Sequence, residues 1–128
     1  MYLTVDFEDR RPLYQQVVDG IKELIARGAL KEGVTLPSVR QVAGDLGVNL
    51  NTIAAAYRQL QEEGFVAVRH GSGAVVKARR SETLPEDELR KGLRAALTGL
   101  ILAGLGEREI VAMVRQELMA VGGKGGSR

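Results

Sequence analysis

The chain has 128 residues, 45% of them hydrophobic, which is enough for one core or one small domain with an appendage, but not for two full domains. It has no cysteine, which excludes disulfides and thiolate metal sites and makes a reducing, cytoplasmic compartment the expectation. The net charge of +2 is too small to indicate a nucleic-acid partner by itself.

No secretory or membrane segment is expected. The start, MYLTVDFEDRRP, lacks a basic stretch followed by an apolar run. The longest apolar stretch, 100–105, is far shorter than the roughly 20 residues that a membrane span requires.

The first predicted helix begins at Pro12, whose fixed φ suits the first turn of a helix. Gly28 is expected to end it. The apolar residues between them recur every three or four positions, as on one face of a helix: Leu13, Val17, Ile21, Leu24 and Ile25.

Two shorter helices are predicted next. Ser38 and Gln41 form a capping-box pattern, and the helix they begin is expected to end at Gly47. Asn49 is the expected N-cap of a third helix that ends at Gly64. The predicted buried stripes are Val39, Val42, Ala43 and Leu46 on one helix, and Ile53, Tyr57 and Leu60 on the other. Two short amphipathic helices separated by a glycine-containing turn are typical of a helix-turn-helix.

A β-hairpin is predicted behind the third helix. Residues 65–69 and 74–77 are rich in Val and Phe, and the turn 70–73 is His-Gly-Ser-Gly. A hairpin in this place is a wing. Five basic or near-basic residues lie in or just after it, although a solvated turn would look similar: Arg69, His70, Lys77, Arg79 and Arg80.

Two further helices are predicted after a polar joint at 79–82. Thr83 and Glu86 form a second capping-box pattern, which predicts a helix over 83–103. Gly104 and Gly106 interrupt the chain, and residues 107–121 predict a last helix. Its predicted inward side chains are Ile110, Val111, Val114, Leu118 and Val121. We therefore expect a mainly α fold with a small β-hairpin: a winged helix-turn-helix domain at 1–80 and a two-helix dimerisation segment at 81–128, disordered from about 122.

The outward face of the third helix carries hydrogen-bonding or very small side chains. Asn51, Ala55 and Arg58 lie on it, with Thr52 and Gln59 at its edge. In a major groove Asn pairs with adenine, Arg pairs with guanine, and Ala contacts a thymine methyl group. A solvated helix face is the alternative, but the run Ala54–Ala56 disfavours it, because such a face more often carries Glu and Lys.

Four linked segments resemble, in order and spacing, the signature of the GntR family of regulators: residues 36–40, 46–53, 63–65 and 70–73. The resemblance covers roughly residues 10–77. The short tail looks like the YtrA-like branch, in which two helices replace a large effector domain.

The resemblance implies that Arg40 contacts DNA from the second helix, that Asn49, Asn51 and Thr52 do so from the third, and that His70 and Gly71 enter the minor groove. Leu50 and Ala54 depart from the family pattern. His70 stands where Arg is common, which implies a weaker and pH-sensitive wing contact, given a reference pKa near 6.5. The full predicted DNA-binding set is Ser38, Arg40, Asn49, Asn51, Thr52, Ala55, Arg58, Arg69, His70 and Gly71.

The partners predicted are double-stranded DNA with a palindromic operator, and a second copy of the chain. One helical pair leaves a large apolar patch in water, and pairing two copies about a twofold axis would bury it. The predicted dimerisation residues are Leu89, Leu93, Leu97, Leu100, Ile101, Ile110, Val114 and Leu118. The function expected is a repressor; whether it has a small-molecule effector stays open.

Other functional classes find less support. An enzyme needs converging catalytic groups, and one histidine with scattered carboxylates supplies none; no cofactor or metal is expected. The segment Gly71–Gly73 lacks the Lys-Ser/Thr of a nucleotide-binding loop. A winged helix that binds protein or RNA remains the alternative, but a protein-docking surface would expose aromatic or large aliphatic anchors on the third helix.

Overall fold

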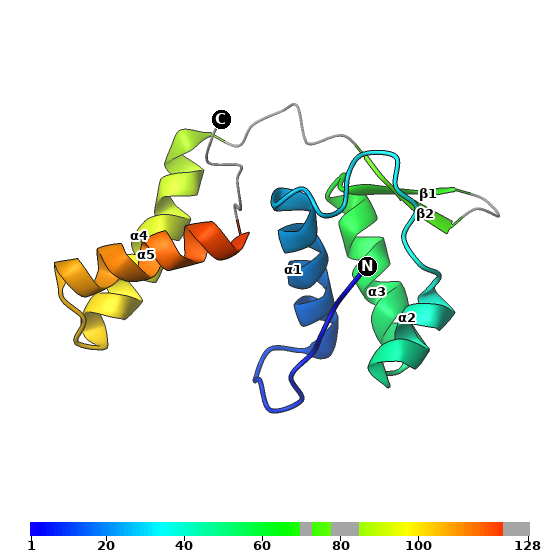
Figure 1. Ribbon diagram of the computed structural model, residues 1–128, viewed down its shortest axis with the longest axis horizontal. Coiled ribbons are helices and arrows are strands. Elements are labelled where there is room, and N and C mark those ends of the chain that lie inside the picture. The colour runs from blue at the N-terminus through cyan, green and yellow to red at the C-terminus, as the bar shows by residue number, and fades with distance from the viewer. Residues whose placement is uncertain (70–72, 78–84, 122–128) are drawn as a thin grey trace. The chain divides into compact units, whose positions relative to one another are not determined.

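The computed structural model describes residues 1–69, 73–77 and 85–121. The chain separates into two compact units, Met1–Arg80 and Ser81–Arg128. Figure 1 shows the elements in chain order, and the predicted fold class of five helices and one hairpin is confirmed. The elements are α1 (Leu13–Ala26), α2 (Val39–Leu46), α3 (Leu50–Glu62), β1 (Val66–Arg69), β2 (Gly73–Val76), α4 (Glu86–Leu102) and α5 (Glu107–Val121).

Local signals set the ends of the first three helices. α1 begins at Leu13, one residue later than predicted, and Pro12 occupies its N-cap position. Ser38 Oγ accepts a hydrogen bond from the Gln41 N–H at 3.0 Å, and Asn49 Oδ1 accepts one from the Asn51 N–H at 2.7 Å. Gly47 ends α2 with a φ of 70°, a left-handed conformation that a side chain disfavours. That turn sets the angle between α2 and α3.

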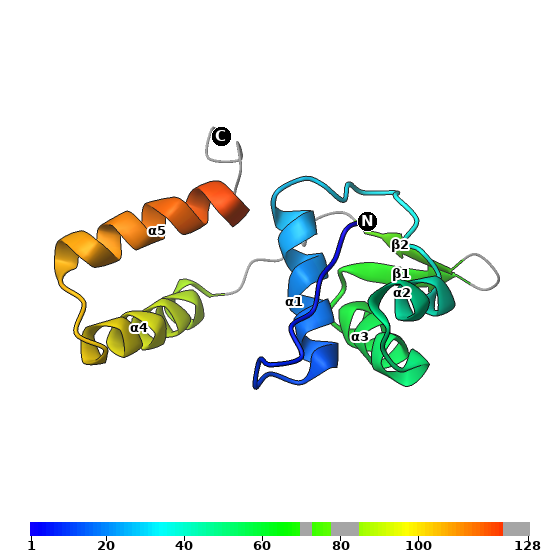
Figure 2. The same cartoon turned by 60° about the horizontal axis from the view of Figure 1, so that its bottom comes forward.

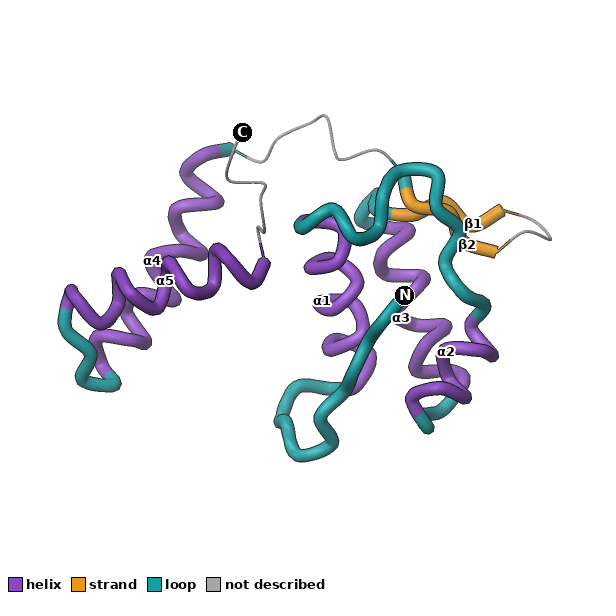
Figure 3. Tube along the Cα trace, viewed as in Figure 1, coloured by secondary structure: helices purple, strands orange, loops and turns teal. Residues whose placement is uncertain are grey.

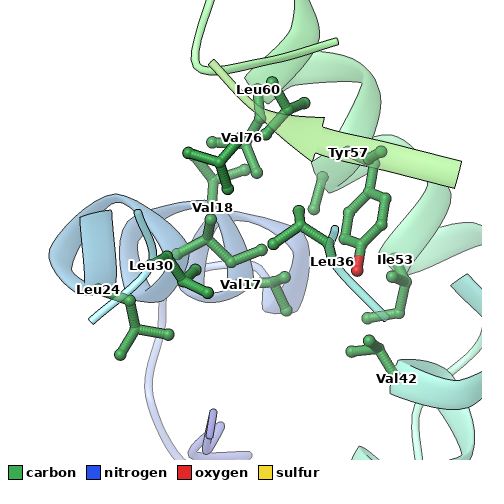
Figure 4. Packing of buried hydrophobic residues seen from close by; sticks show 14 of the residues in the cluster. Val17, Val18, Leu24, Leu30, Leu36, Val42, Ile53, Tyr57, Leu60 and Val76 are labelled. Atoms are coloured by element: carbon green, nitrogen blue, oxygen red, sulfur yellow. The ribbon is translucent and has the colours of Figure 1, made fainter. Parts of the chain in front are cut away.

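The core of the first unit lies between α1, α2, α3 and the hairpin (Figure 4). Val17, Val18 and Ile21 of α1 pack with Ile53 and Leu60 of α3, and all five are at most 1% exposed. Lys22 of α1 and Glu63 at the end of α3 form an ion pair of 2.6 Å. Because this cluster is complete within residues 17–76, the first unit has its own hydrophobic core.

The wing is held by a third segment. β1 and β2 pair antiparallel, with Val66 opposite Val76 and Arg69 opposite Gly73. β1 begins one residue later than predicted and ends where predicted, whereas β2 lies one residue earlier than predicted. The loop before α2 pairs with β2: Leu36 N–H donates to Ala74 O, and Val76 N–H donates to Val34 O, both at 2.8 Å. Figure 3 shows this loop running beside the strands. The wing is thereby attached to the segment that leads into α2.

An N-terminal arm, residues 1–11, is fixed to α1 by Gln16. Gln16 Oε1 accepts a hydrogen bond from the Asp6 N–H at 2.8 Å. Its Nε2 donates to Asp6 O and to Arg11 O, each at 3.1 Å. Leu3 packs against the core farther along the arm. The arm is thus part of the first unit.

The second unit is a helical hairpin, in which α5 turns back after the end of α4 (Figure 2). The predicted start of α4 at Thr83 is wrong: α4 begins at Glu86, and Pro85 occupies the N-cap position. A proline disfavours helical geometry in the residue before it, so Leu84 is a poor first helical residue. Thr83 and the predicted disordered end from 122 lie outside the described residues.

None of the helices in the described ranges combines the length and the apolar character needed to cross a membrane.

Candidate nucleic-acid interface

The start of α2 presents polar groups at the surface of the first unit. Ser38 is exposed at the N-cap, and its hydroxyl is engaged by the Gln41 amide. Arg40 follows in the first turn and is exposed. The opposite side of α2 is buried through Val42 and Ala43. Burial of one side therefore leaves Arg40 available to a partner.

The N-terminal half of α3 carries most of the predicted groove contacts. Asn49, Asn51 and Arg58 are exposed, whereas Thr52 and Ala55 are half-buried. Ile53, Ala56, Tyr57 and Leu60 bury the other side of the helix. An outward face of amide, hydroxyl, methyl and guanidinium groups matches the hydrogen-bonding pattern of base edges in a major groove.

The wing carries the remaining predicted contacts. Arg69 is the last residue of β1, opposite Gly73 of β2. His70 and Gly71 lie outside the described residues. Val68, which precedes Arg69 on β1, is 51% exposed.

Tyr57 connects α3 to the segment before α2. Its hydroxyl donates a hydrogen bond of 2.6 Å to Pro37 O, and its side chain is buried, as predicted. Burial raises the pKa of Tyr57 to about 12. The bond ties α3 to the segment that leads into α2, and both helices carry candidate DNA contacts. Tyr14, also predicted as a packing residue, is 38% exposed on α1.

The second unit exposes most of its apolar side chains. Ile110 is the one buried side chain among the described residues of α4 and α5, so the inward packing predicted for Val111, Val114 and Leu118 is wrong for a single chain. A pair of helices is too small to cover both apolar faces. Leu97 and Leu100 are half-buried, and the other predicted dimerisation residues are 39–62% exposed: Leu89, Leu93, Ile101, Val114 and Leu118.

Sequence reasoning missed the N-terminal arm and the pairing of residues 34–36 with β2. The arm is held by hydrogen bonds to the Gln16 side chain, and residues 34–36 by backbone hydrogen bonds to β2. Partners that lie far apart in the sequence leave no periodic pattern. Pro37 was likewise missed as a residue beside the interface; its position just before the Ser38 cap was the available signal.

The described residues contain no group of three or more His, Cys, Asp or Glu side chains that could hold a metal ion.

Comparison with known proteins identifies the sequence pattern. Residues 13–76, half of the chain, match the family described as bacterial regulatory proteins, gntR family. The chain is 33% identical over 87 residues to the HTH-type transcriptional repressor YtrA of Bacillus subtilis, which covers 68% of this chain and 67% of YtrA. It spans a smaller share, 29%, of the Escherichia coli mannosyl-D-glycerate transport/metabolism system repressor MngR.

Solved structures share the fold. A transcriptional antiterminator from Listeria monocytogenes superposes with a TM-score of 0.85 at 27% identity, covering 96% of this chain and 94% of its own. YtrA from Sulfolobus acidocaldarius, a GntR-family transcription factor, gives a TM-score of 0.60 at 41% identity, covering 73% and 95%. The AraR DNA-binding domain bound to an operator gives 0.54 at 25% identity, covering 59% and 98%.

Proposed function

Because the chain belongs to the GntR family of DNA-binding transcription regulators and resembles its YtrA-like branch, we propose that it is a repressor that binds an inverted-repeat operator as a homodimer. The observation that carries the DNA-binding part is the outward face of α3, where Asn51 and Arg58 are exposed beside the capped start of α2.

In this proposal the first turns of α3 lie in the major groove. Asn51 contacts base edges and Arg40 contacts the backbone and bases from the start of α2, while the wing reaches the adjacent minor groove. A base contact specifies sequence, whereas a phosphate contact adds affinity for any duplex and steepens its salt dependence. The remaining members of the predicted set support these contacts: Ser38, Asn49, Thr52, Ala55, Arg58, Arg69, His70 and Gly71.

The second unit supplies the dimer. Leu89, Leu93 and Ile101 of α4 are each more than half exposed in the single chain. A monomer rarely keeps so large an apolar patch in water, and a second copy would cover it about a twofold axis. The same axis places two copies of α3 on one side of the duplex, so the half-sites should lie about one helical turn, ~10 base pairs, apart.

The repressor role rests on the named relatives, YtrA of Bacillus subtilis and MngR of Escherichia coli. A reporter gene tests it. The operator is placed between promoter and reporter, and expression of the protein should lower transcription. An increase would identify an activator.

Selection from random duplexes tests operator and dimer together. The full chain should recover an inverted repeat and sediment as a dimer at micromolar concentration. A chain ending at Arg80 retains the whole core of the first unit, so it should fold, sediment as a monomer and bind the same duplex far more weakly, because the second half-site contact is no longer intramolecular. A full chain that is monomeric, or a truncated chain of equal affinity, would contradict the dimer.

A further inference from the structure

An apolar cleft of about 320 Å³ opens where the start of α2, α3 and the wing meet. Val39 of α2, Ala54 and Tyr57 of α3, and Val68 of β1 supply its apolar walls. Arg58 and Gln61 of α3 line it as polar residues. The volume lies within the range of roughly 300–1,000 Å³ that small-molecule sites occupy.

Hydrogen bonds between its walls preform this cleft. The Tyr57 hydroxyl donates to Pro37 O at 2.6 Å, which ties α3 to the segment before α2. Leu36 N–H donates to Ala74 O at 2.8 Å, which ties the same segment to β2 of the wing. A ligand would enter a cavity whose three sides are already fixed, and would therefore not have to order them.

The lining combines an exposed apolar side chain with a cationic group. Val68 is 51% exposed although it is a large apolar side chain. The Arg58 side chain is exposed, and none of the hydrogen bonds or ion pairs found among the described residues engages its guanidinium group. An apolar wall beside a free guanidinium group matches a molecule with an apolar body and one negative charge.

We propose that this cleft binds a small aromatic anion, a ring system carrying one carboxylate or sulfonate group. The rings contact Val39, Ala54 and Val68 above Tyr57, and the anionic group pairs with Arg58. Burial of the rings supplies affinity, and the charge fixes their orientation.

The ligand would compete with DNA, an inference that rests on the proposed function. Ser38 and Arg58 line the cleft and also belong to the set that we assign to DNA. One surface cannot hold both partners at once, so binding of the anion releases the operator.

Amide NMR spectra of the full chain test the site in the absence of DNA. The probe is anilinonaphthalene sulfonate, and its uncharged counterpart is phenylnaphthylamine. Both should shift the amides of Val39, Ala54 and Val68. Val68→Ser should lower the affinity for both probes about fivefold or more, since an apolar wall is lost. Arg58→Gln should lower the affinity for the sulfonate probe and leave the affinity for the uncharged probe unchanged.

Phe7→Ser is the matched control, because Phe7 is 63% exposed on the N-terminal arm and does not line the cleft. This substitution should leave the affinity for both probes unchanged. The proposed site is wrong if a probe shifts only amides of residues 86–121. It is also wrong if Phe7→Ser lowers the affinity for a probe and Val68→Ser does not.

Fluorescence of the sulfonate probe, titrated with the selected operator duplex, tests the competition. The duplex should displace the probe, and excess probe should raise the apparent Kd for DNA in proportion to its concentration. A ternary complex without mutual displacement overturns competition, while failure to bind any duplex contradicts only the proposed function. If DNA shifts the cleft amides and neither probe does at millimolar concentration, the cleft is a DNA contact alone and the small-molecule proposal is wrong.

Discussion

Replacing Gln16 should loosen the N-terminal arm and destabilise the first unit. Among the described residues, Gln16 is the one polar side chain that is buried, with 6% exposed. Its amide makes three hydrogen bonds to the arm backbone, two with Asp6 and one with Arg11. Gln16→Leu keeps nearly the same volume and removes all three bonds.

The expected cost follows from those bonds. Each contributes about 0.5–1.5 kcal/mol net, and the abandoned backbone groups regain water where the arm is partly exposed. The added apolar side chain offsets part of the loss. We therefore expect the free energy of unfolding to fall by about 1–3 kcal/mol, and Tm to fall by roughly 4–8 °C per kcal/mol in a domain of this size.

Thermal unfolding followed by circular dichroism measures the loss. Gln15→Leu is the matched control, because Gln15 is the preceding α1 residue and, among the described residues, its side chain bonds to Asp19 alone, at 2.9 Å. Surface changes of that kind stay within about 0.5 kcal/mol. Gln16→Glu separates the contribution of the accepted bond from that of the two donated bonds. At neutral pH the carboxylate still accepts from the Asp6 N–H but cannot donate to the two carbonyls.

Hydrogen exchange of the Asp6 amide gives a local readout of the same change. Gln16→Leu should abolish its protection, and Gln15→Leu should leave it intact. If both variants unfold at the same temperature and the Asp6 amide stays protected in both, the three bonds do not hold the arm.

Four further substitutions test the site and its support. Asn51→Ala should weaken operator binding by about 1–3 kcal/mol and relax specificity at one base pair, with Tm unchanged; equal anisotropy titrations would contradict the groove contact. Gly44→Ala should stabilise α2 by up to about 1 kcal/mol, because an added Cβ meets nothing within 4 Å, whereas Gly20→Ala should gain less, since its Cβ would lie 2.9 Å from Leu3 Cδ2. Tyr57→Phe should cost about 1 kcal/mol. Because burial raises the pKa of Tyr57 to about 12, above its unfolded value near 10, wild-type stability should fall as pH rises from about 10 to 12, and urea unfolding should show a smaller fall in the variant.

The sequence predicted helices wherever a local signal marked an end. Pro12, Ser38, Asn49 and the acidic start at Glu107 act within one turn of themselves, and the structure begins helices beside each. The exposed face of α3 could also be predicted, because helical periodicity fixes which residues lie opposite Ile53 and Tyr57. These parts of the fold depend on nearest neighbours along the chain.

Non-local pairing left no such signal. The loop before α2 joins β2 through alternating backbone bonds, which any side chains at 34–36 could make. Gln16 reads as an ordinary polar position on a helix until the arm is seen to cross it. At α4 two local signals conflicted, a capping-box pattern and a proline, and the proline prevailed because its ring restricts the residue before it whatever the cap offers.

The two units differ in what stabilises them, and this difference connects folding to regulation. The first unit buries a complete core, so its fold does not depend on a partner. The second buries Ile110 alone among its described side chains, so most of its stabilisation must come from the proposed second copy. Dimer formation and folding of the tail would then be one equilibrium. The fraction of operator bound should therefore rise more steeply with protein concentration than it would for a preformed dimer. The reason is that dissociation of the second copy also removes the contact with the second half-site.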